Sequence, residues 1–493
     1  MKPQSLLSSL NPANAPDMLA ARERAEIDAS IRKPGLLFFG SAVFWLLAGS
    51  ALGLLSAWKM THPGLLDSMG WLTFGRIRPA HLNAVIYGWA SQAGIGTGLW
   101  LMARLCRVRL MHSSLVISAA VFWNVGVLVG VLGILAGDSR SIEWLEFPGY
   151  ATPILFLAYA FIGVWAVVMF RYRKPGRVYV SQWYLLAAFL WFPWMYATAN
   201  ILLVWQPVLG PAQGAVNWWF AHNLLGLWFT PIGLASAYYM IPKILGRPIR
   251  GYSLSVLGFW SLAIFSSWNG MHHLIGGPFP AWMISAGVAA SLLMFIPVVA
   301  AAINFHLTMR GGFDALKWSP ALRFTVFGAM GYTVVSLQGG LMAIPSLNAV
   351  THFTDTTIGH AHLGMYGFFS MMMFGAMYFI VPRLAGREWP SATMIRWHFW
   401  LAAVGVLLSV ASLTIGGLLQ GLAQYDPTVS FRSSLEDAAP FRVMRGISGF
   451  LLLAGHLIFA THFVQILLKS GPLREGPGLF ETPVGNRSEA VSS

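Results

Sequence analysis

The sequence predicts an all-α integral membrane protein built as a bundle of twelve transmembrane helices. Only 10% of its 493 residues are charged and 56% are apolar, whereas soluble domains carry about 25% charged residues. The apolar residues gather in blocks of about 20 residues or more, the length that crosses the hydrocarbon core of a bilayer. Backbone groups in lipid must find hydrogen bonds within their own segment, so we expect each block to be a helix.

The twelve blocks contain no Asp, Glu, Lys or Arg, and one such charge at a helix centre would cost about 2.5–3.5 kcal/mol on insertion. We place them at residues 37–58, 81–103, 115–136, 151–170, 183–204, 217–241, 253–275, 281–304, 324–344, 358–381, 398–420 and 446–468. They form one domain over residues 37–469, with a polar N-terminal segment at residues 1–36 and a polar C-terminal tail at residues 470–493.

The connections between the blocks alternate in charge, and this alternation orients the chain. Arg and Lys gather after the even-numbered blocks, as between Arg171 and Arg177, whereas the connections after the fifth and seventh blocks carry no charge. The connections after the first and eleventh blocks depart from this alternation. Because positive residues stay on the cytoplasmic side, the pattern predicts a multi-pass membrane protein with both termini in the cytoplasm.

The net charge of +14 is spread over these connections and forms no single basic patch. The composition therefore indicates membrane lipid as a partner and no nucleic acid. The single cysteine, Cys106, cannot form an internal disulfide. It also excludes a covalent c-type haem in this chain, because that attachment needs two cysteines and a histidine.

Six of the 13 histidines are expected at one depth, near the outer face of the membrane. Four lie in the first turns of inward-running blocks and two at the outer end of the seventh block: His81, His222, His360 and His362, then His272 and His273. His360 and His362 point about 200° apart on a helix, so each is expected to face a different metal group. Together with His222, the adjacent pair can form a three-nitrogen site of the kind that suits copper, iron or zinc.

The remaining histidines stand in loops, at cytoplasmic ends or singly. Six of them are expected to be ordinary structural residues: His62, His112, His306, His398, His456 and His462. The seventh, His352, lies just before the tenth block, and its position allows contact with a haem propionate.

Four stretches around the six histidines resemble the catalytic subunit I of the haem-copper oxygen reductases. They are residues 74–85 (FGRIRPAHLNAV), residues 218–223 (WWFAHN), the pair His272 and His273, and residues 354–362 (TDTTIGHAH). The cbb3-type cytochrome c oxidase branch is closest, and nitric oxide reductases are relatives. The resemblance extends over about residues 36–470 and includes the order and spacing of the motifs.

The resemblance implies a location in the bacterial cytoplasmic (inner) membrane. It also implies two haems of b type and a third metal. His81 and His362 would be the axial ligands of the low-spin haem, and His360 would be the proximal ligand of the high-spin haem. His222, His272 and His273 would hold a copper ion, or a non-haem iron as in nitric oxide reductases. The substrate, O2 or NO, would bind between this metal and the high-spin haem, so these three histidines and His360 are the candidate catalytic residues.

Further residues match secondary sites of the family. Basic residues expected near haem propionates are Arg76, Arg78, Arg442 and Arg445, together with His352. Tyr238, Tyr252 and Ser255 match a proton pathway, and they fit equally well as hydrogen-bonded interior groups. Glu143 and Glu146 resemble an acidic stretch that binds calcium, and they also fit an ordinary solvated loop.

Three positions depart from the family pattern. Ser266 stands where cbb3-type oxidases carry a cross-linked tyrosine, and Gly226 stands where other branches carry tyrosine or, in nitric oxide reductases, glutamate. Gln338 replaces a glutamate found 22 residues before the high-spin haem ligand. Reduction of O2 to water takes four electrons, one of them usually from the tyrosine, whereas reduction of two NO to N2O takes two. The missing tyrosine therefore favours nitric oxide reduction, which is kept as the alternative. Oxygen reduction remains the leading expectation because the sequence around the motifs resembles the cbb3-type branch.

Two hypotheses from other classes are weaker. Twelve spans suit a non-redox transporter, but such a protein has no use for six clustered histidines. A haem-storage or haem-sensing protein needs axial histidines but no three-histidine set. Because this chain lacks the cysteines of an electron-entry site, we expect a membrane-anchored c-type cytochrome subunit on the outer face. Cytochrome c or a similar electron donor would act upstream of it.

Overall fold

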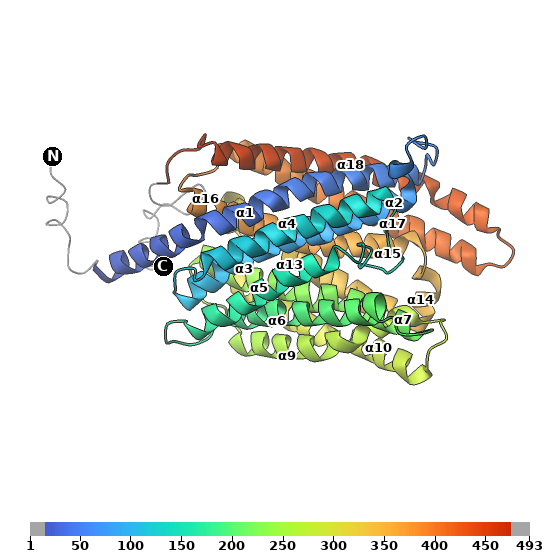
Figure 1. Cartoon of the computed structure of the whole chain (residues 1–493), viewed down its shortest axis with the longest axis horizontal. Helices are drawn as coiled ribbons and strands as arrows, with labels where there is room; N and C mark the ends of the chain where they lie inside the picture. The colour runs from blue at the N-terminus through green and yellow to red at the C-terminus, as the bar shows by residue number, and fades with distance from the viewer. Residues whose placement is uncertain (1–14, 475–493) are drawn as a thin grey trace.

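The computed structural model describes residues 15–474, and this part of the chain is helical. Over this range there is no strand, only one isolated antiparallel bridge between Arg387 and Leu473. The long helices run side by side along the longest axis of the molecule (Figure 1). The all-α class predicted from the sequence is therefore confirmed.

Residues 15–474 form eighteen α-helices with six short 3-10 or π segments between them. In chain order they are α1 (Ala15–Lys59), η3 (Gly70–Leu72), α2 (Phe74–Asn83), η4 (Ala84–Ala90), α3 (Ser91–Cys106), α4 (Ser113–Ala136), α5 (Thr152–Arg171), α6 (Val180–Asn200), η5 (Ile201–Trp205), α7 (Ala212–Asn223), η6 (Leu224–Phe229), α8 (Thr230–Leu245), α9 (Tyr252–Asn269), η7 (Gly270–Leu274), α10 (Ala281–Leu293), α11 (Phe295–Met309), α12 (Ala315–Trp318), α13 (Pro320–Met342), α14 (Pro345–Thr351), α15 (Asp355–His362), η8 (Leu363–Ser370), α16 (Met371–Ala385), α17 (Ala392–Tyr425) and α18 (Phe431–Leu467).

Nine helices or continuous helical runs among residues 15–474 are long and apolar enough to cross a membrane. A tenth is added if α13 and α14, which meet at 102°, count as one broken span. Each of the twelve blocks predicted from the sequence overlaps a helix. The block at 324–344 lies in the broken tenth span, and those at 81–103 and 253–275 belong to none of the ten. The count of twelve spans and the cytoplasmic placement of the termini therefore stay predictions.

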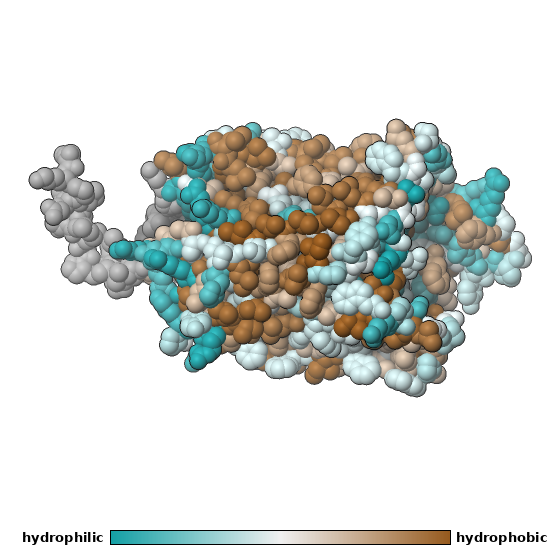
Figure 2. Space-filling view, in the orientation of Figure 1, coloured by the Kyte–Doolittle hydropathy of each residue, from teal (hydrophilic) through white to brown (hydrophobic). Residues whose placement is uncertain are grey.

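The surface has the distribution of apolar residues that a lipid-facing protein needs. Figure 2 shows hydrophobic residues over the middle of the molecule and hydrophilic residues gathered toward its two ends. Large apolar side chains such as Phe44, Val164 and Ile264 are more than half exposed. A soluble monomer rarely exposes apolar surface on this scale, whereas lipid covers such a band at little cost.

Helix α1 begins at Ala15, so it extends through much of the segment predicted as a polar N-terminal extension. Acidic residues of its N-terminal half pair with basic residues at the end of α3 and directly after it. Arg104 contacts Asp28 at 2.9 Å, with both side chains largely buried, and Arg107 contacts Glu23 at 2.9 Å. These ion pairs hold the start of α1 against the bundle, and the domain boundary at residue 36 stays a prediction.

Three helical runs switch to a π segment close to a predicted histidine ligand. Segment η4 begins three residues after His81, η6 two residues after His222, and η8 directly after His362. Single π turns inside α-helices are frequent at functional sites. The first turns of α2, α7 and α15 gather at the end of the bundle opposite the start of α1 and the end of α18 (Figure 1).

Candidate metal centre

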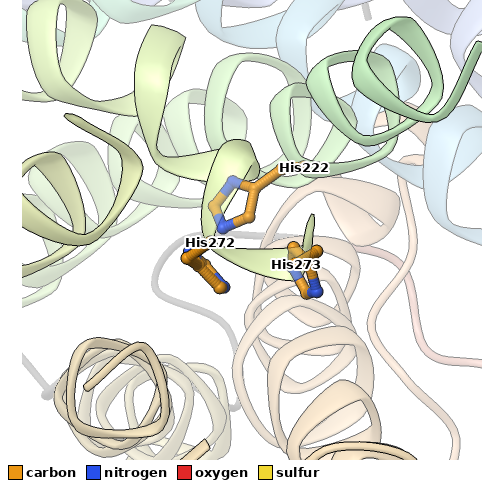
Figure 3. Close-up of side chains that lie close together, drawn as sticks. All are labelled: His222, His272 and His273. Atoms are coloured by element: carbon orange, nitrogen blue, oxygen red, sulfur yellow. The ribbon is translucent and has the colours of Figure 1, made fainter. Parts of the chain in front are cut away.

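Three histidines from two elements form a compact cluster. His222 comes from α7, and His272 and His273 come from η7; one ligand nitrogen from each lies within 4.8 Å of the others. Figure 3 shows the three rings gathered at one point. Glycine at position 270 permits this approach, because a Cβ there would lie only 2.9 Å from the His222 Cβ.

The hydrogen bonds of the cluster leave nitrogens free for a metal. The Ser291 hydroxyl donates to the Gly287 carbonyl oxygen at 2.7 Å, so it accepts a proton from His272 Nδ1 at 2.8 Å. Nε2 of neutral His272 is then a lone-pair donor. His222 Nδ1 is buried and has no hydrogen-bond partner. A buried polar atom without a partner is costly unless something absent from the chain satisfies it, and a metal ion fits.

Trp218 fixes the third ring. Its indole stacks on the His273 imidazole with ring centroids 4.0 Å apart and planes 11° apart. The stack restricts rotation of the imidazole, as a preorganised ligand requires. Neither Ser291 nor Trp218 was among the residues predicted for the site. Trp218 stands one turn before His222 in the same motif, so the sequence spacing could have indicated its contact with the site. No local sequence pattern indicates Ser291.

The two histidines of α15 face different neighbours. His362 lines a cavity together with His81, and His360 does not. His360 lies near enough to His222, His272 and His273 to interact electrostatically with all three. The opposite orientation predicted from the two-residue spacing is therefore the arrangement found in the structure.

Gln338 of α13 orients His360. Its side-chain oxygen lies 3.3 Å from His360 Nδ1, so the imidazole donates this proton and keeps Nε2 free. An amide oxygen and a carboxylate oxygen both accept such a proton. Gln338 can therefore orient the His360 ring by the same kind of hydrogen bond as the glutamate expected at this position, but without a negative charge.

The cavity beside α15 has a lining that fits a haem. About 970 Å³ of empty space, part of it open to solvent, lies between α1, the α2–η4 run, the α15–η8 run and α18, and the wall is mostly apolar. His81 Nδ1 donates to the Gly49 carbonyl oxygen at 2.7 Å, and His362 Nδ1 donates to the Ile358 carbonyl oxygen at 2.8 Å. Both imidazoles keep Nε2 as a metal ligand, and these residues fit an axially ligated haem.

Arg445 is the only one of the four predicted arginines that lines this cavity. Its nearest polar contact is the Met60 sulfur at 3.0 Å, and it is 9% exposed. The charge of Asp355 acts on Arg445, but no carboxylate among residues 15–474 forms an ion pair with it. A buried guanidinium without a paired carboxylate is suited to a haem propionate. Arg442 instead pairs with Asp355 at 2.7 Å.

The other predicted propionate contacts are also engaged within the chain. Arg78 lies 3.6 Å from Glu143, and Arg76 donates to the Leu135 carbonyl oxygen at 3.1 Å. His352 is half-buried and stacks on Phe353, with centroids 3.9 Å apart. Their role toward a haem stays a prediction.

Glu146 is a buried carboxyl that contacts α2, the helix that carries His81. It is 4% exposed and accepts a hydrogen bond from Asn83 Nδ2 at 2.9 Å. Burial raises the pKa of Glu146 to about 7, and the charge of nearby Glu143 adds to the rise. The expectation of an ordinary solvated loop does not hold for Glu146, because the loop packs it against Asn83.

The residues proposed for a proton pathway have different environments. Tyr252 donates to the Val178 carbonyl oxygen at 2.8 Å, and Ser255 donates to the Tyr252 carbonyl oxygen at 2.6 Å. Tyr238 is buried, its ring stacks on Tyr184 at 5.8 Å, and its hydroxyl has no hydrogen-bond partner. Two of the three hydroxyls therefore serve backbone carbonyls, and only that of Tyr238 is available to a passing water.

Comparison with known proteins gives one consistent family. A family model described as cytochrome c and quinol oxidase polypeptide I matches residues 33–451. A subunit of the cbb3-type cytochrome c oxidase of Stutzerimonas stutzeri is 34% identical over 436 residues, which are 85% of this chain and 91% of that protein. A cytochrome c oxidase subunit 1 homologue from bacteroids of Bradyrhizobium diazoefficiens is 33% identical over 85% of this chain and 79% of its own.

Two further matches are more distant. A nitric oxide reductase protein of Stutzerimonas stutzeri is 27% identical over 50% of this chain and 55% of its own. A solved chain of a haem-copper terminal oxidase dimer superposes with a TM-score of 0.76 at 16% identity, covering 92% of this chain and 86% of that one. The fold of the whole bundle is thus shared with a haem-copper oxidase. From the family match over most of its length and from these relatives, the chain belongs to the family of cytochrome c and quinol oxidase polypeptide I, the subunit I of haem-copper oxidases.

Proposed function

We propose that this subunit is the catalytic part of a terminal respiratory oxidase that reduces O2 to water with electrons from a cytochrome c-type donor. The observation that carries the proposal is that two histidines of α15 face different groups of residues. His362 shares the cavity beside α15 with His81, and His360, two residues away, turns toward the cluster of His222, His272 and His273. One helix turn would therefore join the residues that hold a low-spin haem to the residues that hold the high-spin haem and the third metal.

The chain's own residues would position these groups. His81 and His362 would hold a low-spin haem b, His360 a high-spin haem b, and the three clustered histidines a copper ion. When bound, these groups supply the electron storage and the gas-binding site. The protein contributes fixed imidazole orientations through Gly49, Ile358, Gln338 and Ser291, and a dry apolar surrounding.

The donor set favours copper as the third metal. The cluster within 4.8 Å contains three imidazoles, and no carboxylate belongs to it among residues 15–474. Neutral imidazoles suit copper, whereas non-haem iron sites more often add a carboxylate ligand. Gly226, at the place of the nitric oxide reductase glutamate, offers no such ligand.

Nitric oxide reduction remains a second candidate because of one specific observation. Neither Ser266 nor Gly226 can supply the tyrosine electron that oxygen reduction ordinarily uses. Reduction of two NO to N2O takes two electrons, which the two metals of the site can deliver alone. The partial match to a nitric oxide reductase is consistent with this alternative.

The surroundings of the site support further components. The protein is an inner membrane protein, and we place its metal sites toward the outer face, where a membrane-anchored c-type cytochrome would deliver electrons to the low-spin haem. A calcium ion between Glu143, Glu146 and the haem propionates would compensate the buried carboxyl of Glu146.

Metal analysis of the purified chain with its partner subunits tests the proposal. After correction for c-type haem, two irons and one copper per chain, with O2 consumption, are expected. Three irons without copper, with NO consumption, would establish the nitric oxide reductase instead. A preparation without any haem would exclude both and favour a non-redox transporter.

A further inference from the structure

Three side chains on the wall of the cavity beside α15 form a hydrogen-bonded chain to which no role has been given. His456 of α18 lies between Ser50 of α1 and Tyr366 of η8, and all three line the cavity. His456 Nδ1 is 2.7 Å from the Ser50 Oγ, and its Nε2 is 2.7 Å from the Tyr366 hydroxyl oxygen. His456 is 3% exposed, so both of its ring nitrogens form these bonds in the interior of the protein.

The Ser50 hydroxyl fixes the direction in which the hydrogen bonds of this side-chain series point. The Ser50 hydroxyl donates its only proton to the Leu46 carbonyl oxygen at 2.6 Å. Ser50 must therefore accept from His456 Nδ1–H, which makes Nε2 of the neutral ring an acceptor. The Tyr366 hydroxyl must then donate to Nε2, so every proton points from Tyr366 toward Leu46.

A chain of aligned hydrogen bonds has a negative end and a positive end. Its members polarise one another in a low-dielectric interior, so the effect exceeds that of one hydroxyl. The negative end here is the Tyr366 oxygen, whose proton is directed away and whose remaining lone pair has no partner among residues 15–474. Tyr366 follows His362 by one turn in the same helical run and shares the cavity with it.

A second tyrosine–histidine pair, away from the cavity, serves as a comparison for Tyr366 and His456. Tyr378 of α16 bonds His398 Nδ1 at 2.8 Å, and both side chains are buried, but neither lines the cavity. The same kind of bond is therefore present twice in neighbouring parts of the bundle, and only the pair of Tyr366 and His456 can act on a haem in the cavity.

We propose that His456 is a positioning residue that aims the Tyr366 hydroxyl so that its oxygen presents negative charge to the low-spin haem and lowers its reduction potential. This inference rests on the proposed function, since it requires a haem between His81 and His362. An oxidised haem carries one more positive charge than a reduced one. A fixed negative partial charge beside it therefore favours the oxidised form.

The test is a redox titration of the low-spin haem in the purified complex, with haem content measured on each sample. Tyr366→Phe removes the hydroxyl oxygen at the negative end of the hydrogen-bonded chain. His456→Leu removes the nitrogen that accepts the Tyr366 proton. Each is expected to shift the haem equilibrium toward the reduced form by about threefold or more, a rise of about 28 mV at 59 mV per tenfold change. His456→Gln keeps one acceptor and one donor at similar spacing, so its potential should match the wild type.

Tyr378→Phe is the matched control, because it removes a buried tyrosine–histidine bond away from the cavity; no shift is expected. Equal potentials in Tyr366→Phe and Tyr378→Phe, with full haem content, would overturn the inference and leave the proposed function intact. A shift in His456→Gln as large as in His456→Leu would also overturn it. If His456→Leu does not retain haem, Tyr366→Phe and His456→Gln still decide the outcome. A wild-type complex without haem would overturn the proposed function itself.

Discussion

The hydroxyl of Ser266 occupies the space in which a side chain on Gly226 would begin. A Cβ placed on Gly226 of η6 would overlap the Ser266 Oγ and lie 3.2 Å from the Ser266 Cβ. Ser266 Oγ also lies 3.5 Å from the Asn223 side-chain oxygen, one residue after His222. The two positions at which relatives carry a tyrosine or glutamate are therefore in contact here, and both hold small residues.

This contact predicts that Gly226→Ala destabilises the protein. The added methyl group cannot fit without moving Ser266, and overpacking of a tight interior costs about 1–3 kcal/mol. Ser266→Ala removes the overlapping oxygen, so the double variant should recover much of the loss. Thermal unfolding of the four proteins in detergent measures this coupling, and additive effects of the two substitutions would contradict the contact.

Ser291 is predicted to support metal binding through His272. Ser291→Ala removes the acceptor that fixes the His272 ring, and loss of such an outer contact typically lowers metal affinity by about 10–100-fold. The measurement is the metal retained after dialysis against graded chelator. Ser267→Ala is the control, because the Ser267 hydroxyl donates only to the Ala263 carbonyl oxygen. Equal metal retention in the two variants would argue against this role for Ser291.

Gln338 is predicted to be a positioning residue for His360. Two variants test whether a hydrogen-bond acceptor at this position is enough or whether its charge also matters for haem binding. Gln338→Leu removes the acceptor at 3.3 Å, so the high-spin haem signal in carbon monoxide difference spectra should fall. Gln338→Glu restores an acceptor of the same length and should retain the signal. A normal spectrum in Gln338→Leu would mean that helix packing alone orients His360.

Glu146 is predicted to make stability depend on pH. Its pKa is raised to about 7 in the folded protein, compared with 4.5 for an ordinary glutamate. The fold therefore favours the protonated carboxyl. Its destabilising effect begins as pH rises past the unfolded-state pKa and is complete above about pH 7, where it amounts to about 3 kcal/mol.

The measurement for Glu146 is the thermal midpoint between about pH 5 and pH 8. The midpoint of the wild type should fall more steeply with rising pH than that of Glu146→Gln, which keeps an acceptor for Asn83. Addition of calcium at the upper pH should restore the wild type and leave Glu146→Gln unchanged. Parallel pH profiles for the two proteins would exclude a titration of Glu146 in this range.

The sequence alone determined the class of protein and the grouping of the six histidines. Block length, the scarcity of charge and the helical repeat are local properties, so they predicted an all-α membrane bundle and the opposite directions of His360 and His362 without knowledge of packing. The resemblance of the motifs then indicated the family, which the comparisons confirm.

Only the tertiary structure decided which side chains support the histidines. Ser291 and Gln338 stand 19 and 22 residues from the histidines that they contact, on other helices. The chain of Tyr366, His456 and Ser50 joins residues up to 406 positions apart. Such contacts depend on how each helix is rotated and how far it is shifted along its neighbours. Those two quantities are set by the packing of whole helix faces and leave no trace in a local sequence pattern.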